Sequence, residues 1–136
     1  VWGLAITEWG VAITEEGIAL NESSGTFTIT APGGNQPLEP RFVIEVTRDV
    51  DEFLRIHNKT DWNYIQFNTE AVAWQVFIID TVNETATLDD VNIMATKVGG
   101  NFITIDWEAE IEIYDKDQIY SWSDMNITAY YRNILL

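Results

Sequence analysis

The sequence predicts an all-β protein, an antiparallel β-sandwich or jelly roll with an extended N-terminal β arm and at most one short helix. Apolar and polar residues alternate in several short segments, and the longest of these is Phe102–Tyr114. A period of two is the pattern of a half-buried strand. Turn residues separate the segments, and only Asp49–His57 shows helical spacing.

The chain begins with one seven-residue unit written three times, starting at Trp2, Trp9 and Glu16. Seven is also the period of a coiled coil. Each unit holds a glycine, however, and glycine costs about 1 kcal/mol in a helix interior. The strongest apolar pair of each unit is spaced by two, as in Val11 and Ile13. We therefore expect a strand, in which a bulge or turn at each glycine resets the buried face.

This arm is too long for the domain that carries it. Residues 1–22 would span roughly 65 to 70 Å when extended, whereas a domain of this size is only about 35 to 40 Å across. The arm must fold back, coil, or reach into a neighbouring copy, and we expect the last. We divide the chain into an arm, 1–25, and a β-sandwich body, 26–136. The assembly residues we expect are Leu4, Ile6, Trp9, Val11, Ile13, Ile18 and Leu20.

The body reads as a series of strands. A loop or hinge at Ala31–Pro40 contains all three prolines. Gly99-Gly100 is a hairpin turn signal. In Asp49–His57, Asp49 and Glu52 resemble a capping box, so this segment is the one candidate helix. The expected strands are Thr26–Thr30, Phe42–Val46, Tyr64–Phe67, Ala71–Ile79, Val91–Val98, Phe102–Tyr114 and Met125–Tyr131.

Composition limits the partners. The net charge is −15, and the first 40 residues hold no Lys or Arg. Nucleic acid and anionic lipid both need basic patches, so neither is an expected partner. No apolar run reaches the roughly 18 residues of a membrane span. A first residue of Val suggests a processed, exported protein, although a trimmed chain would look the same.

Four N-glycosylation sequons support export. They are expected at the surface, carrying glycans in an extracellular protein, at Asn21, Asn58, Asn83 and Asn126. The alternative is that a Thr-rich β protein produces such sequences by chance.

The Phe102–Tyr114 segment places four carboxylates on one face, at about 7 Å intervals. They are candidate Ca²⁺ ligands together with loop carboxylates, because hard cations take clustered oxygens. A solvated outer face is the interpretation we favour, because no loop of the sequence matches a known calcium-binding pattern. We therefore expect no cofactor, with Ca²⁺ as the alternative at Asp106, Glu108, Glu110 and Glu112.

Nothing indicates catalysis. The chain has no cysteine, and its single histidine, His57, lies beside apolar residues. The nucleophile-elbow, zinc-protease and phosphate-loop patterns are absent. We expect a protein that is not an enzyme.

The arm, the hinge, the all-β body and the sequons together predict a structural subunit of an extracellular surface filament. Such a subunit would polymerise head to tail with copies of itself by inserting its N-terminal strand into a neighbour. In this plan the chain resembles archaeal donor-strand-exchange filament subunits of the thread and bundling-pilus class, with TasA-like fibre proteins as analogues. The resemblance implies a cell-surface, self-assembling glycoprotein pilus.

Two alternatives stay open. Six Trp and five Tyr suit a secreted carbohydrate-binding β-sandwich with surface glycans as partners, and a planar row of exposed Trp would favour it. Otherwise Trp74 and Trp107 lie on core faces. A viral coat or spike protein would use the same arm and body.

Overall fold

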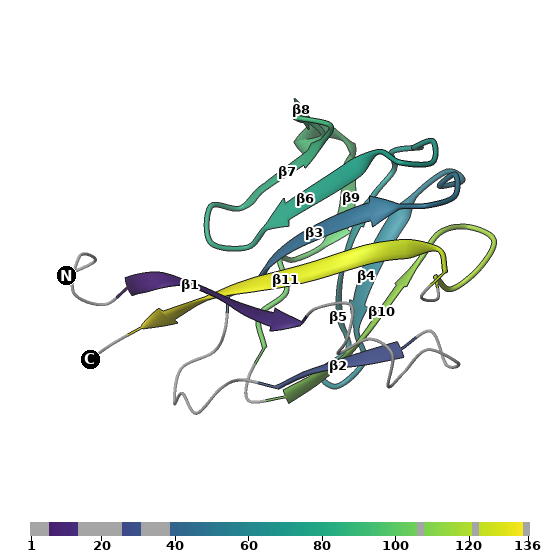
Figure 1. Cartoon of the computed structure of the whole chain (residues 1–136). Coiled ribbons are helices and arrows are strands. Elements are labelled where there is room, and N and C mark those ends of the chain that lie inside the picture. Colours follow the sequence, from purple (N-terminus) through teal and green to yellow (C-terminus); the bar gives the residue numbers. More distant parts are fainter. Residues whose placement is uncertain (1–5, 14–25, 31–38, 106–107, 121–122, 135–136) are drawn as a thin grey trace.

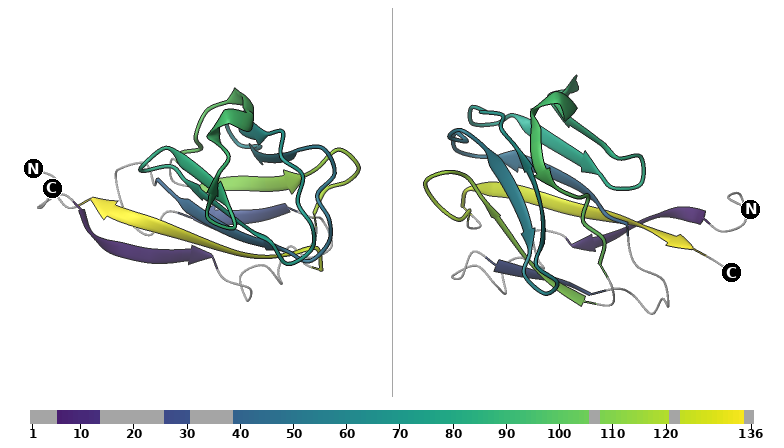
Figure 2. Two further views of the ribbon diagram at one scale, coloured as in Figure 1. Left: turned by 90° about the horizontal axis from the view of Figure 1, so that it is seen from above. Right: turned by 180° about the vertical axis from the view of Figure 1, so that it is seen from behind.

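The computed structural model describes residues 6–13, 26–30, 39–105, 108–120 and 123–134. Two antiparallel sheets pack face to face as a sandwich (Figures 1 and 2). The six-stranded sheet has the order β1-β11-β3-β6-β7-β8, and the five-stranded sheet has the order β2-β10-β4-β5-β9. The predicted fold class is confirmed.

The strands of the six-stranded sheet are β1 (Ile6–Ile13), β3 (Arg41–Val46), β6 (Val76–Asp80), β7 (Thr85–Leu88), β8 (Val91–Asn92) and β11 (Met125–Ile134). Those of the five-stranded sheet are β2 (Thr26–Thr30), β4 (Leu54–Asn58), β5 (Asn63–Phe67), β9 (Lys97–Gly100) and β10 (Glu108–Tyr114). A short 3₁₀ helix, η2 (Met94–Thr96), precedes β9. Among the described residues, no helix is long and apolar enough to cross a membrane.

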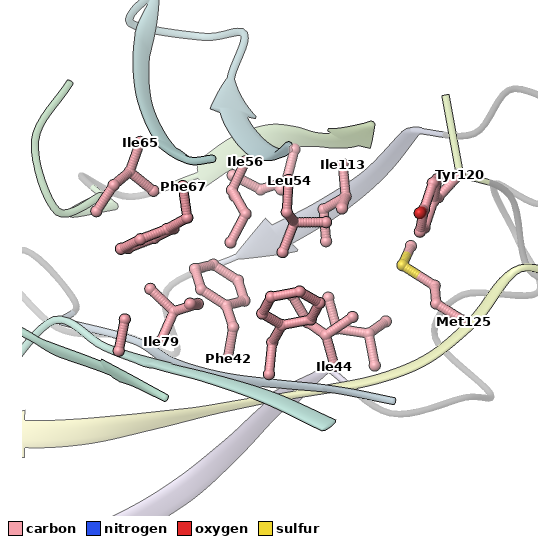
Figure 3. Close-up of a cluster of buried hydrophobic side chains, with 14 of the residues drawn as sticks. Phe42, Ile44, Leu54, Ile56, Ile65, Phe67, Ile79, Ile113, Tyr120 and Met125 are labelled. Atoms are coloured by element: carbon pink, nitrogen blue, oxygen red, sulfur yellow. The ribbon is translucent and has the colours of Figure 1, made fainter. Parts of the chain in front are cut away.

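Alternation in the sequence sets which side chains enter the core. In β3, Phe42, Ile44 and Val46 are buried while the residues between them are partly exposed. Strand β4 repeats the pattern from the opposite sheet. Figure 3 shows the two sets meeting, with Phe42, Ile44 and Ile79 on one side and Ile56, Leu54, Ile65, Phe67 and Ile113 on the other. Burial of each large aliphatic or aromatic side chain contributes about 1.5 to 3 kcal/mol.

The predicted helix at Asp49–His57 is wrong. Its second half is strand β4, and Leu54, Ile56 and Asn58 are buried at strand spacing. Asp49 does not cap a helix, because its Oδ1 accepts from the Ala73 N–H at 2.9 Å. The residues that suggested a helical period of about 3.6 residues lie partly in a loop and partly in β4. In that loop Glu52 has φ 65°, which is not a helical conformation. Tertiary pairing with β5 and β10 overrides the local pattern.

The Gly99-Gly100 turn is also wrong. Both glycines lie in β9, where Gly99 pairs with Gln66 and Gly100 with Ile65. The strand predicted at Phe102–Tyr114 is accordingly shorter. Ile103 and Ile105 are buried before it, and β10 begins only at Glu108.

The strand predicted at Ala71–Ile79 is real only in its second half. Strand β6 begins at Val76, and a turn precedes it. Trp74 in that turn is 66% exposed, so the expectation that it lies on a core face is wrong. The expected strand at Val91–Val98 is divided into β8, η2 and the start of β9.

Candidate interaction surface

Three loops meet at the end of the sandwich opposite the chain termini (Figure 1). They connect β3 to β4, β5 to β6, and β10 to β11. Backbone hydrogen bonds join the first two, because Val50 and Ala71 form a bridge and the Trp74 N–H donates to the Val46 carbonyl at 2.6 Å. The third loop joins the first through the Lys116 N–H, which donates to the Asp51 carbonyl at 3.3 Å. This end of the molecule is therefore one connected surface.

Asp115 is the acceptor that organises these loops. Its side chain is fully buried and pairs with Arg48 at 3.0 Å. The same carboxylate accepts from the backbone N–H of Asp51 at 2.9 Å, of Asp117 at 2.9 Å and of Gln118 at 3.1 Å. These donors stabilise the ionised form of the buried carboxylate. Because they come from the β3–β4 loop and the β10–β11 loop, Asp115 fixes the positions of both loops.

The charge of Asp115 depends on those donors. Burial disfavours the ionised carboxyl, but the Arg48 hydrogen bond and three backbone N–H groups outweigh burial and lower the pKa of Asp115 to about 2. The Tyr120 hydroxyl lies 3.3 Å from Asp115 Oδ2, and burial raises the pKa of Tyr120. The Arg48 guanidinium stacks 4.0 Å above the Tyr120 ring. The buried cluster thus holds a carboxylate, a guanidinium and a neutral phenol.

A groove runs beside this cluster. It has a volume of about 380 Å³ and is lined by Asp49, Val50, Asp51, Glu70, Ala71, Val72 and Gln75. A second hollow, of about 540 Å³, is lined by Glu52, Phe53, Gln66, Asn68 and Glu70. Glu70 borders both. Among the described residues, neither lining set includes a Lys or Arg.

The outer face of the five-stranded sheet carries a second ordered group. Arg55 of β4 donates from Nε to Gln66 Oε1 at 2.8 Å and from Nη1 to the Tyr114 hydroxyl at 3.1 Å. Its guanidinium stacks 4.3 Å from the Tyr64 ring centre. Sequence reasoning missed these residues. The only pattern that these residues share in the sequence is an outward-facing position in a strand of alternating apolar and polar residues. That position by itself does not distinguish an ordered cluster from a solvated face.

The comparisons with known proteins decide the family. A profile of the siphovirus-type tail component, C-terminal domain, matches residues 33–132. The chain belongs to this family. No curated protein matches.

One solved structure shares the fold of this tail component. It is described as the crystal structure of the SPP1 Dit (gp 19.1) protein, "a paradigm of hub adsorption apparatus in Gram-positive infecting phages". The two chains share 8% sequence identity, with a TM-score of 0.59. The match covers 82% of this chain and 46% of SPP1 Dit, so this chain spans about half the length of that relative. At this identity the likeness shows a shared fold.

Family membership corrects the predicted function. The chain is a phage tail component, so the resemblance to archaeal thread and bundling pili was wrong, as were the pilus function and the cellular surface location. An N-terminal arm joined to a β-sandwich body does not identify one class of filament, because β-sandwiches occur in many unrelated assemblies. The viral alternative is the one that the match favours. As a structural component of a virion tail, the protein is not an enzyme.

In this tail component, the N-terminal arm pairs with its own chain where the structure describes it. Strand β1 lies antiparallel to β11, with Gly10 opposite Tyr131 and Val11 opposite Tyr130. The register shifts between Ile6 and Trp9 and again between Val11 and Ile13. The expected strand is therefore present, with irregularities that flank Gly10. Leu4, Ile18 and Leu20 lie outside the described residues, and an assembly role for the arm residues stays a prediction.

The sequons fall in different environments. Asn58 is 1% exposed, so its prediction as a surface glycan site is wrong. Asn83 is exposed, and Asn126 is partly exposed with its amide donating to Glu45 Oε1 at 2.9 Å. Asn21 lies outside the described residues. The sequence Asn-Lys-Thr at Asn58 has a structural role instead, because Asn58 Oδ1 accepts from the Thr60 N–H at 3.0 Å and its amide donates to the Thr104 carbonyl at 3.4 Å.

We expect Asn58→Ala to lower the free energy of unfolding by about 1 to 3 kcal/mol. The substitution leaves the Thr104 carbonyl and the turn N–H groups without their partner. Urea unfolding followed by tryptophan fluorescence measures the change. Asn83→Ala, in an exposed sequon, is the control and should change stability by less than half as much; equal losses at both positions would contradict the structural role.

The acidic face of β10 gathers no ion site in the part of the chain that is described. Glu110 is exposed, and Glu112 lies 3.5 Å from the Lys59 ammonium. Asp106 lies outside the described residues, and the side chain of Glu108 is likewise not described. Within the described ranges, no group of three or more candidate ligands is close enough to hold a metal. The expectation of no cofactor stays a prediction, with Ca²⁺ as its untested alternative.

Exposed tryptophans do not form a row in the described part of the chain. Trp62 is 74% exposed in the turn between β4 and β5, and Trp74 is 66% exposed in the loop between β5 and β6. Trp62 directly precedes β5 of the five-stranded sheet, whereas Trp74 directly precedes β6 of the six-stranded sheet. This arrangement does not favour a flat sugar-binding platform made from both.

Proposed function

We propose that this chain is a structural domain of the tail hub of a siphovirus, where it contacts other tail proteins through its loop end and its outer sheet face. The observation that carries the proposal is the family match across residues 33–132. SPP1 Dit, which shares the fold, is described as a paradigm of the hub adsorption apparatus. A comparable position in the tail is therefore our proposal for this chain.

The surfaces described above suit such a role. Arg, Tyr and Trp dominate the energetics of protein interfaces, since they bury large areas with few flexible bonds. Arg55, Tyr64 and Tyr114 form an ordered group on one face, and Trp74 is exposed at the loop end. The Asp115 cluster fixes the loops, which reduces the entropy lost when a partner binds.

Immunogold electron microscopy of virions tests this proposal. Antibody raised against the purified chain should label the distal end of the tail in the phage that encodes it. Pre-immune serum on the same virions is the control. Labelling confined to the capsid, or absence of the protein from purified virions by mass spectrometry, would overturn the proposal.

A further inference from the structure

We propose that the groove beside Trp74 docks a segment of another tail protein that presents a Lys or Arg next to an apolar side chain. The inference rests on the proposed function, since it names the kind of partner that the loop end would take. Two features carry it: an exposed apolar pair in a fixed turn, and a groove whose charged lining residues, among those the structure describes, are all acidic.

The turn that carries Trp74 is held in place from several sides. The Trp74 N–H donates to Val46, the Ala73 N–H donates to Asp49 Oδ1 at 2.9 Å, and the Val72 N–H donates to Gln75 Oε1 at 2.9 Å. Trp74 has φ 78°, a left-handed conformation that bulky side chains rarely adopt. Such conformations persist only where the surroundings enforce them, and they cluster at functional positions.

This fixed turn presents apolar surface to solvent. Trp74 is 66% exposed and Val72 is 60% exposed, although both are large and apolar. Val72 also lines the groove. A tryptophan that is already positioned loses little entropy on binding and is the residue type most often found as an interface hot spot. The turn therefore supplies an apolar anchor at the edge of the groove.

The groove defines the charge of the partner. Its charged lining residues are Asp49, Asp51 and Glu70, and none of the lining residues in the described part of the chain is basic. The chain as a whole carries −15. A long-range field of this sign attracts a positive segment and rejects an acidic one. Arg and Lys also combine a charged head with an apolar stem, which fits a groove that includes Val50, Ala71 and Val72.

A neutral sugar fits the same surface less well. A sugar needs free planar polar groups beside the aromatic ring, but both ends of the Gln75 amide are engaged. Its Oε1 accepts from Val72, and its Nε2 donates to Asp89 Oδ2 at 3.1 Å. Asp49 Oδ1 likewise accepts from Ala73. Those bonds leave the carboxylate charge in place, so the site retains attraction for a cation.

Binding measurements with the other tail proteins of the same phage test the inference. Each purified protein is passed over the immobilised chain at low and at high salt. We expect at least one to bind, with affinity that falls as salt rises. Trp74→Ala should weaken that binding about thirtyfold, the loss typical of a hot spot. Glu70→Gln should weaken it several-fold and reduce its dependence on salt.

Trp62→Ala is the matched control, because Trp62 is also an exposed tryptophan in a turn with positive φ. It should leave binding within twofold of the unchanged chain. Thermal unfolding of each variant establishes that it is folded. The inference is overturned if no tail protein binds, if Trp74→Ala binds normally, if both tryptophan variants lose affinity equally, or if binding is insensitive to salt.

A panel of neutral oligosaccharides forms the remaining arm of the experiment. Sugar binding that is lost in Trp74→Ala would replace the proposed peptide segment by a glycan. Immunogold labelling of the tail is a separate measurement. If the protein is located at the tail hub but its groove binds no partner, this inference fails while the proposed function stands.

Discussion

Gly100→Ala is expected to lower the free energy of unfolding by about 3 kcal/mol or more, the largest effect of any single methyl group that we predict. A Cβ built at Gly100 would lie 1.7 Å from the carbonyl oxygen of Tyr64 and 2.5 Å from its carbonyl carbon. These are backbone atoms of the paired strand β5, so they cannot rotate away. Gly100 also has φ 79°, where a side chain adds strain of its own.

Gly99→Ala is the matched control for that experiment. The new Cβ would meet the Tyr64 hydroxyl at 2.8 Å, and that atom ends a side chain that can turn. We expect a loss of less than about 1 kcal/mol, because overpacking against a movable group is relieved by a small rotation. Urea unfolding of both variants gives the comparison. Equal stability of Gly100→Ala and the parent would show that β9 does not pair with β5 as described.

The glycine pair also shows where sequence reasoning succeeded and where it failed. The period-two pattern located the inward faces of β3 and β10 correctly, because burial on one face of a sheet imposes alternation directly. A Gly-Gly pair indicates only that the backbone has no room for a side chain or adopts a conformation that side chains disfavour. A tight turn and a close contact with another strand both impose this requirement. The sequence could not distinguish them, because the partner strand lies more than thirty residues away.

The candidate site was less predictable for a related reason. The sequence indicated Asp115 only as a loop carboxylate that could join a Ca²⁺ site, because the groups that donate to it come from a loop distant in sequence. Trp74 looked like a core residue since its neighbours are apolar, yet the turn before β6 exposes it. Asn58 fitted a sequon, but the strand pattern of β4 places it inward. In each case the function of the residue depends on which distant segment lies beside it.

Asp115→Asn is expected to lower the free energy of unfolding by about 3 to 5 kcal/mol at neutral pH. The substitution removes the charge that Arg48 pairs with and presents an amide where backbone N–H groups now donate. Arg48 and those N–H groups would then lose the acceptor they share. Asp117→Asn is the control, since Asp117 is exposed in the same loop; it should change stability by less than about 0.5 kcal/mol.

The contribution of Asp115 to the free energy of unfolding should also depend on pH, and its lowered pKa predicts that the contribution is lost in acid. The folded-state pKa of about 2 lies below the ordinary value of 3.8, so the ionised carboxylate stabilises the native state above about pH 4. As pH falls through about 2, the native state also binds the proton and this contribution, of order 2 kcal/mol, is lost. Stability measured by urea unfolding should therefore differ most between parent and Asp115→Asn at neutral pH, and the difference should shrink between about pH 4 and pH 2. A difference that stays constant over that range would show that Arg48 and the loop N–H groups do not hold Asp115 as an ion.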